Sequence, residues 1–564
     1  MKNPAPKTKI APKKRAIKTR VFIFTSLFYH CKHKSAPDNI KPVSGLTKLL
    51  IAAAFLNGLS WIVLIPIWQY PDEQSHFAQV QDIAELKNNP KTGFNTSLEI
   101  ATAERLLGTE RDGLGNNQFT YQPYYHIDYS NTKDGLYENF ISNLPKDSRT
   151  SMVKWEATQN PPLYHIMASN FYRLTTRNNL FTRVYAIRIF SLLIYLALIL
   201  ILTNASKLIF AKEKEAQTIL PGIIAFTPML VFSTTGVLPD PLTIFLFTAI
   251  FTVCLHLIRT KISLSHIILL AVLNTLGIFT RQQFEIAMPI SLLAVIYGLY
   301  QLTPKSKKLA FWAGLFLLAA ISVVSIKIHP GILTFPEIGI PNLALIFTSQ
   351  FVSYLVSSLK HYYSQTLPWY WGVYKWLSFT MPHIYYQVIN RIIVLALFGL
   401  LIFAVKIIKN RKLTKTALLL IFLIISCFLY FAIFLLWDFY FQKQYGYSFG
   451  VQGRYFLPFV LPLSAILFFG LRELFKIFLK NNLPYFYFTI AFIMIIFNDA
   501  SLAYVSSTYY FTSNIHVFIN QASQYKPEIF KGNTIIILIC LALLLQVLYL
   551  YKLLRYSFSA NESN

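Results

Sequence analysis

The sequence predicts an all-α integral membrane protein with about twelve transmembrane helices and a long first extracytoplasmic loop. Three observations lead to this fold class. Only 13% of the 564 residues are charged, whereas about 25% is usual in soluble proteins. The mean hydropathy is high, at +0.47. Apolar runs near the roughly 20 residues that cross a bilayer recur along the chain.

The first residues form a basic tail, in which Asp38 is the only acidic residue. The apolar patch Val21–Tyr29 is too short to span a bilayer, so it is expected on the membrane surface. It lacks the position and flanks of a cleavable signal peptide, and the first true span would act as an uncleaved anchor. We therefore divide the chain into a basic cytoplasmic tail, 1–46, and a polytopic membrane domain, 47–564.

The first span, roughly 46–68, carries no charge between Leu49 and Trp68. Further apolar runs follow at roughly 184–203, 218–236, 241–258, 265–280, 285–302, 309–328, 387–405, 416–436, 455–475, 484–504 and 534–551. A few of these runs are short, and one of them could be re-entrant.

Loops rich in lysine and arginine alternate along the chain with loops that hold few basic residues. With the N-terminus inside, every inner loop is basic, from Lys207 and Lys212 in the first to Lys552 and Arg555 at the end. The opposite short loops hold few cations, namely Arg281, Lys443 and Arg454. Since short basic loops stay in the cytoplasm, we predict a plasma-membrane protein with both termini cytoplasmic.

The net charge of +27 could suggest nucleic-acid binding. The charge lies in the tail and the inner loops, and there is no basic face with interleaved aromatic residues, so nucleic acid is excluded as a partner. The cysteines lie in the tail or in apolar runs, without metal-ligand spacing or a disulfide framework, at Cys31, Cys254, Cys427 and Cys540.

Three longer segments are predicted outside the cytoplasm: 70–182, 329–386 and 505–533. The segment 329–386 is rich in tryptophan and tyrosine. Such residues form a belt at the membrane interface, but they could also stack on a sugar or cradle a lipid chain.

The motif Pro71-Asp72-Glu73-Gln74-Ser75-His76 emerges directly after the first span. If a helix starts after Pro71, Asp72 and His76 share one face, and Glu73 is also within reach of His76. The three side chains would then form an acid/base or metal-capable cluster at the membrane surface. The alternative is that the two acids only cap the helix.

Charged residues at the outer ends of other spans are expected to converge with this motif in an outward-facing polar cavity, because charges inside a bilayer are costly and usually functional. They are Arg183, Arg188, Asp240, Arg281, Glu285, Asp438, Arg454 and Asp499. The alternative for each residue is that its side chain snorkels to the membrane surface or caps a helix.

Two further motifs matter. Gln159-Asn160-Pro161-Pro162-Leu163-Tyr164 joins an extended entry to a helix start. Gln452-Gly453-Arg454-Tyr455-Phe456-Leu457-Pro458 places an arginine at the outer mouth of a span, where a guanidinium suits a phosphate.

Together with Pro239-Asp240, these motifs resemble a family of bacterial polytopic membrane proteins of unknown function. That family is similar to the GT-C superfamily of lipid-phosphosugar-dependent glycosyltransferases. The resemblance covers most of residues 46–480. One departure is visible, because the family tends to have asparagine two places before the aspartate, where this chain has Leu238.

The resemblance implies a GT-C-like fold, a catalytic acid in the first outer loop and a polyprenyl-phosphate-linked sugar as donor. Carried onto this chain, Asp72 or Glu73 becomes the catalytic base, and Arg281 and Arg454 bind the donor phosphate. Supporting roles are expected for His76, Asp240, Asn160, Tyr164, Arg188 and Gln452.

We predict an inverting transfer of the sugar to an extracytoplasmic glycan, lipid or protein. One carboxylate of the acid pair would take the acceptor proton while arginines stabilise the departing phosphate. A magnesium or manganese ion on Asp72, Glu73 and His76 is an alternative to the arginines. The rival functions are a transporter or flippase of a lipid-linked or anionic glycan, and a non-catalytic assembly or sensing subunit.

Overall fold

The structure is a computed structural model, and it describes residues 44–86, 94–112, 115–127, 129, 134–156, 161–260, 262–308, 346–411, 413–448, 450–479 and 482–562. Contacts divide the chain into two units, of which Gly45–Asn564 is the larger. Nearly all of the predicted basic tail, including its apolar patch, lies outside the described residues.

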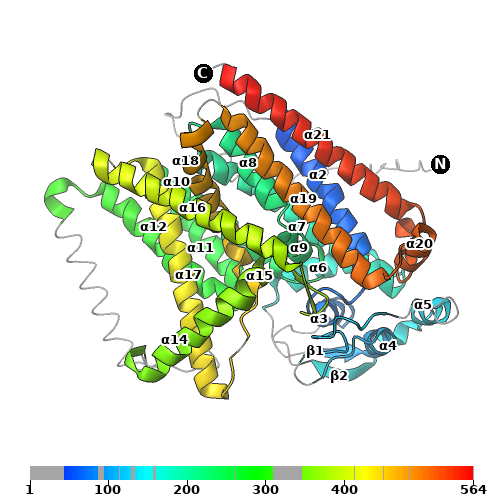
Figure 1. Cartoon of the computed structure of the whole chain (residues 1–564). Coiled ribbons are helices and arrows are strands. Elements are labelled where there is room, and N and C mark those ends of the chain that lie inside the picture. The colour runs from blue at the N-terminus through cyan, green and yellow to red at the C-terminus, as the bar shows by residue number, and fades with distance from the viewer. Residues whose placement is uncertain are drawn as a thin grey trace, which may run out of the picture. The chain divides into compact units, whose positions relative to one another are not determined.

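Helices dominate the larger unit (Figure 1). In the described ranges, 9 helical stretches are long and apolar enough to cross a membrane. They contain α2 (Ser44–Leu64), α7 (Leu180–Ile209), α10 (Asp240–Arg259), α12 (Ala287–Leu302), α16 (His383–Asn410), α17 (Lys415–Tyr445), α18 (Val460–Leu479), α19 (Leu483–Tyr510) and α21 (Thr534–Glu562). The predicted all-α membrane class is confirmed.

Three of the predicted spans are not among these stretches. Where 218–236 was expected to be one span, the chain forms α8 (Lys214–Ala225) and α9 (Pro228–Thr235), bent by 60°. Pro228 causes the break, because it lacks an N–H and its ring clashes with a continuing helix. The run 265–280 forms the short helix α11 (Leu264–Ile278), and 309–328 is outside the part that the structure describes.

Polar residues at loop ends fix where several spans begin. The side chain of Asn179 accepts a hydrogen bond from the backbone N–H of Thr182 and starts α7. Thr414 accepts in the same way from Ala417 and starts α17. These contacts satisfy backbone donors that the first turn of a helix leaves unpaired.

The segment between α2 and α7, which the sequence predicts outside the cytoplasm, folds into small elements at one end of the helices (Figure 1). They are α3 (Glu73–Glu85), β1 (Phe94–Ser97), α4 (Leu98–Leu107), α5 (Asp134–Ser142), η1 (Lys146–Arg149), β2 (Met152–Glu156) and α6 (Leu163–Leu174). Strands β1 and β2 pair antiparallel, with Phe94 opposite Glu156. Helix α3 packs on α6, and Arg183 of α7 is paired with Glu99 of α4. The segment is therefore anchored to the spans.

The remaining elements lie in the two other predicted outer segments and at several helix ends. They are η2 (Gln282–Ile286), η3 (Lys305–Lys307), α14 (Ser349–His361), the π-helical turn η6 (Tyr362–Thr366), α15 (Leu367–Trp371), β3 (Val373–Tyr374), β4 (Phe379–Thr380), η7 (Gly453–Phe459), α20 (Ile515–Ser523) and η9 (Glu528–Phe530).

The aromatic-rich segment contributes to the core. Tyr370 and Tyr374 are buried, and the Tyr374 ring lies 5.8 Å from that of Trp61 and 5.0 Å from that of Phe232. The indole of Trp376 donates to the carbonyl of Trp68 at 3.0 Å. This segment therefore closes over the chain that follows α2, next to the predicted site.

Candidate functional site

The turn after α2 positions the first acidic residue of the predicted site. Asp72 precedes α3 and has a left-handed backbone conformation, with φ 55° and ψ 20°. Aspartate and asparagine tolerate this conformation better than most residues. The carboxylate makes no capping hydrogen bond to the helix. Capping therefore does not account for Asp72, and its side chain is available for other contacts.

The Asp72 carboxylate lies between two guanidinium groups. Its Oδ1 is 3.4 Å from Nη1 of Arg111, and its Oδ2 is 3.4 Å from Nη2 of Arg454. The Asp72 side chain is 38% exposed, whereas both arginine side chains are 8% exposed. These distances exceed the roughly 2.7–2.9 Å of tight charge-assisted hydrogen bonds. The carboxylate is therefore held loosely and can reach a ligand.

Glu73 has a different environment, although it is the next residue. Its side chain is fully buried and accepts from Nε and Nη2 of Arg188 at 2.8 and 2.6 Å. It also accepts from the backbone N–H groups of Trp68, at 3.0 Å, and Val237, at 3.2 Å. These four hydrogen bonds occupy both carboxylate oxygens, so Glu73 joins three parts of the chain rather than facing a ligand.

Arg188 completes this buried connection. Besides Glu73, its guanidinium donates to the backbone carbonyls of Ile62, Ile65 and Pro66, at 3.2, 2.8 and 2.9 Å. These carbonyls belong to the end of α2 and the turn that follows it. Arg188, predicted as a supporting residue, therefore holds the turn that carries Asp72.

A second acid–arginine pair lies beside the first. Nη1 of Arg281, just before η2, contacts Oδ1 of Asp240 in the first turn of α10. The guanidinium carbons of Arg281 and Arg454 lie 5.9 and 5.5 Å from the centre of the same Tyr455 ring. Burial and the positive charge of Arg454 both lower the pKa of Arg281. The structure thus brings Asp72, Asp240, Arg281 and Arg454 together.

Two histidines border this cluster. Nδ1 of His76 lies 3.1 Å from Nε2 of His165. Burial, followed by the charge of His165, holds the pKa of His76 well below its ordinary value, and the three nearby arginines act in the same direction. Burial lowers the pKa of His165 to about 3. Both rings are therefore neutral near pH 7.

The other supporting residues are placed as follows. The Tyr164 hydroxyl lies 2.8 Å from Oγ of Ser191 and is buried. Gln452 precedes η7, and its carbonyl accepts from the backbone N–H of Tyr455. Asn160 lies outside the described residues. Leu238, the departure from the family pattern, is buried beside the Pro239-Asp240 turn.

Arg111 was missed by the sequence analysis. It lies in the middle of a long polar segment, beside Glu110 and Asp112, where neither a span end nor a motif marks it. Only the folding of that segment brings it to Asp72.

The predicted metal alternative has no support in the geometry. Glu73 is occupied by Arg188, and Asp72 faces two arginines. Among the residues whose positions are described, no group of three or more histidine, cysteine or acidic side chains could hold a metal ion.

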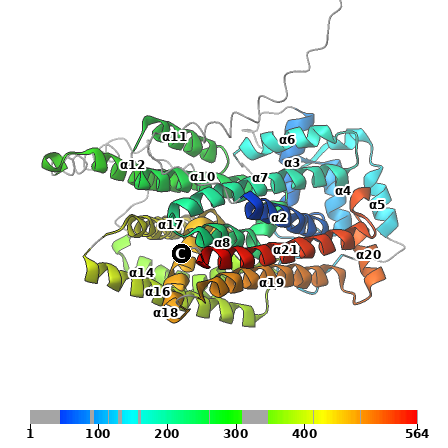
Figure 2. The same cartoon turned by 90° about the horizontal axis from the view of Figure 1, so that it is seen from above.

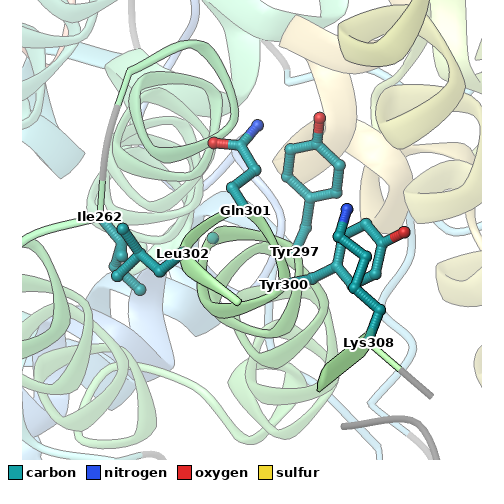
Figure 3. A pocket seen from close by; sticks show the side chains of 7 residues that line it. Ile262, Tyr297, Tyr300, Gln301, Leu302 and Lys308 are labelled. Atoms are coloured by element: carbon teal, nitrogen blue, oxygen red, sulfur yellow. The ribbon is translucent and has the colours of Figure 1, made fainter. Parts of the chain in front are cut away.

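A hollow of about 460 Å³ lies away from this cluster (Figure 3). Its lining includes Tyr297, Tyr300 and Lys308, at the end of α12 opposite Arg281. The Lys308 ammonium lies 4.0 Å from the centre of the Tyr300 ring. None of the residues of the predicted site lines this hollow.

The sequence matches, over residues 55–463, a family described as "Predicted membrane protein (DUF2142)". No functionally curated protein matches it. Among solved structures, it is similar to an oligosaccharyltransferase of Archaeoglobus fulgidus in the apo form, with 12% identity and a TM-score of 0.41, over 86% of this chain and 57% of that one.

A second similar structure is the oligosaccharyltransferase AglB of Archaeoglobus fulgidus in complex with an inhibitory peptide and a dolichol-phosphate. The identity is 12% and the TM-score 0.42, over 83% of this chain and 56% of that one. The chain thus spans little more than half the length of these two structures.

Proposed function

The chain belongs to the DUF2142 family of predicted membrane proteins, and we propose that it is a membrane glycosyltransferase of the GT-C type. Its donor is a polyprenyl-phosphate-linked sugar, and its acceptor is an extracytoplasmic glycan, lipid or protein. The observation that carries this proposal is the partly exposed carboxylate of Asp72, held between the buried guanidiniums of Arg111 and Arg454.

The cluster has the charge that a phosphate group needs. The three guanidiniums of Arg111, Arg281 and Arg454 outnumber the carboxylates of Asp72 and Asp240. Guanidiniums bind phosphate oxygens in pairs of parallel hydrogen bonds. Nε of Arg454 is buried and has no hydrogen-bond partner within the described part of the chain, so it has a donor to offer. Because these arginines are held in place before the donor binds, they need little rearrangement to stabilise it.

In the proposed step, an acceptor hydroxyl oxygen attacks the anomeric carbon from the side opposite the phosphate. The bond between this carbon and the phosphate oxygen breaks, and its electron pair leaves with the lipid phosphate. Asp72 takes the hydroxyl proton, and the arginines stabilise the charge gained by the phosphate. The sugar passes through an oxocarbenium-like transition state, as in glycoside hydrolysis, and its configuration inverts.

Of the two acids predicted as base, Asp72 fits this role and Glu73 does not. A base must reach the proton that it removes, and the Asp72 side chain is 38% exposed. Glu73 is fully buried and bonded to Arg188.

The test is sugar transfer by purified full-length protein in lipid vesicles. The probe is a radiolabelled undecaprenyl-phosphate hexose with a membrane extract as acceptor. Asp72→Asn is expected to lower kcat by about 10²–10⁴-fold, the usual contribution of a general base. Glu110→Gln is the matched control, because Glu110 lies in the same outer segment and is paired with Arg105 instead. Equal transfer by the Asp72→Asn and Glu110→Gln proteins would contradict the proposal.

The same vesicles test the transporter alternative. A flippase would move the labelled lipid across the bilayer and form no glycosidic product. Transfer of the label to the acceptor without any ion gradient supports the enzyme.

A further inference from the structure

A second polar site lies inside the helical region, away from the Asp72 cluster. α2, α19 and α21 lie side by side, with α20 at one end (Figures 1 and 2). A groove of about 510 Å³ lies between them. None of its lining residues belongs to the Asp72 cluster, so it is a separate feature.

A network of hydrogen bonds joins residues that line this groove, namely Asn57, Asp499 and Gln546. Nδ2 of Asn498 donates to Oδ1 of Asn57 at 2.7 Å and to Oδ1 of Asp499 at 3.2 Å. Nε2 of Gln546 donates to the same Asp499 oxygen at 3.0 Å. Asp499 was expected near the outer end of its span, but it lies well inside α19. Polar residues within spans are costly and usually functional.

The simplest explanation is that this network joins three helices, as polar residues do in membrane proteins. That explanation does not account for two polar atoms of the network. Among the residues that the structure describes, Nδ2 of Asn57 and Oε1 of Gln546 are buried and have no hydrogen-bond partner. Their residues are 1% and 2% exposed, and both line the groove. One atom is a donor and the other an acceptor.

A hydroxyl group has the chemistry that both atoms need, because its oxygen can accept from Asn57 and its hydrogen can be donated to Gln546. The walls of the groove suit a hydrocarbon, with Leu64, Leu502 and Ile539 among the residues that form them. Leu543 lines the groove and is 44% exposed, so the groove is continuous with the lipid-facing surface.

The charge of the groove excludes an anionic head group. Asp499 is the only charged residue among those that line it, and no lysine or arginine is present there to pair with a phosphate. This separates the groove from the Asp72 cluster, which has three arginines.

We infer that the groove between α2, α19 and α21 binds an uncharged lipid whose hydroxyl group is held by Asn57 and Gln546. The lipid is distinct from the phosphate-bearing donor of the Asp72 cluster, and its binding does not depend on glycosyl transfer.

The test uses three photoactivatable probes with the same diazirine-bearing C16 chain, namely an alcohol, an alkane and a phosphate. Each is added to full-length protein in phosphatidylcholine vesicles, and labelled peptides are identified by mass spectrometry. The alcohol is expected to label α19 and α21 saturably, with competition by unlabelled hexadecanol. Labelling by the other two probes should be about tenfold weaker, since one or two hydrogen bonds are lost.

Two variants locate the site. Gln546→Leu is expected to weaken alcohol labelling about tenfold while leaving alkane labelling unchanged. Ala542 lines the groove one helical turn before Gln546, so Ala542→Phe fills the groove and should abolish saturable labelling. Leu541→Phe is the control, because Leu541 is a neighbour on α21 that is 43% exposed and does not line the groove.

Several results would overturn the inference. The first is equal labelling by the alcohol and the alkane, which would mean an ordinary bilayer contact. The second is stronger labelling by the phosphate than by the alcohol. The third is unchanged alcohol labelling of folded Gln546→Leu and Ala542→Phe proteins. If both variants misfold, the three probes on the unaltered protein still decide.

Discussion

At the scale of single residues, two neighbouring acids differ in what surrounds them. Glu73 accepts four hydrogen bonds, two of them from Arg188, whereas the Asp72 side chain is partly exposed. A buried charge that loses its partner destabilises a protein strongly, while an exposed one can act on a ligand. Substitution of Glu73 should therefore lower the stability of the protein, whereas substitution of Asp72 should lower its activity.

We expect Glu73→Gln to lower the stability of the protein by about 3 kcal/mol or more, because it leaves the Arg188 charge buried without a counter-ion. The measurement is the Tm of the purified protein in detergent. Asp72→Asn, at a partly exposed side chain, should leave Tm within a few degrees of the unaltered protein. An unchanged Tm for Glu73→Gln would show that the pair does not stabilise the fold.

Arg454 offers a second test of the phosphate site. Arg454→Lys keeps the charge but loses the planar fork that binds two phosphate oxygens. We expect the KM for the lipid-phosphate donor to rise about tenfold, the equivalent of one lost charge-assisted hydrogen bond. Arg105→Lys is the control, because Arg105 is exposed and pairs with Glu110. A KM equal to that of the control would show that Arg454 does not bind the donor.

The two histidines predict how stability depends on pH. Both pKa values are lower in the folded protein than the ordinary 6.5. Below about pH 6.5 the unfolded chain therefore binds more protons than the folded one. Stability should fall as pH drops from about 6.5 towards 4, by up to about 1.4 kcal/mol per pH unit for each histidine.

Thermal unfolding between pH 8 and 4.5 measures this effect. His165→Gln, which keeps a polar side chain without a titrating group, should show a smaller loss of Tm at low pH than the unaltered protein. Parallel curves for the two proteins would exclude His165 as the cause.

At the scale of elements, close backbone contact positions the short helix η7. A Cβ on Gly453 would overlap the backbone of Trp369 and Tyr370 in α15. Glycine is therefore needed where η7 meets the aromatic-rich segment. The next residue is Arg454, so this contact also fixes the arginine that faces Asp72.

We expect Gly453→Ala to destabilise the protein by about 1–3 kcal/mol, because the added methyl group forces α15 and η7 apart. Transfer activity should fall with it, since Arg454 moves. Gly45→Ala is the matched control, because a Cβ there has no atom within 4 Å. The measurements are the Tm and the transfer activity of both variants. Equal values for Gly453→Ala and Gly45→Ala would show that the close contact at Gly453 does not position η7.

The helices show what the sequence could and could not predict. Hydropathy located each of the long spans, because a run of apolar residues is a local property. The break before Pro228 was not predicted, since the apolar run continues from 218 to 236 and hydropathy does not register the missing N–H of a proline within it. Between α2 and α7 the sequence indicated helix starts after Pro71 and after Pro161-Pro162, where α3 and α6 begin. The elements β1, α4, α5 and β2 were not predicted, because their cores are small and their contacts are distant in sequence.

At the scale of the whole molecule, the alternation of basic loops predicts the orientation in the membrane. Tyr124 lies in the predicted first outer segment and is 86% exposed, and Leu413 lies in a predicted inner loop and is 51% exposed. In intact cells, Tyr124→Cys should react with a membrane-impermeant maleimide, and Leu413→Cys should react only after permeabilisation. The opposite pattern would place the Asp72 cluster on the cytoplasmic side and would exclude the proposed extracytoplasmic sugar transfer.

The sequence predicted four members of the cluster, Asp72, Asp240, Arg281 and Arg454, because charges beside apolar runs are conspicuous. It could not separate Asp72 from Glu73, since the difference arises from Arg188, which lies more than a hundred positions along the chain. Arg111 could not be found for the same reason.

The Glu73–Arg188 pair also bears on how the protein is made. Arg188 lies within α7, and an arginine entering lipid alone costs about 2.5–3.5 kcal/mol during insertion. Its carboxylate partner follows α2 and is synthesised earlier. The nascent α2 and α7 are therefore expected to leave the translocon as a neutralised pair, once the intervening segment has crossed. Assembly of this protein would then begin with these two helices, before the remaining spans have been synthesised.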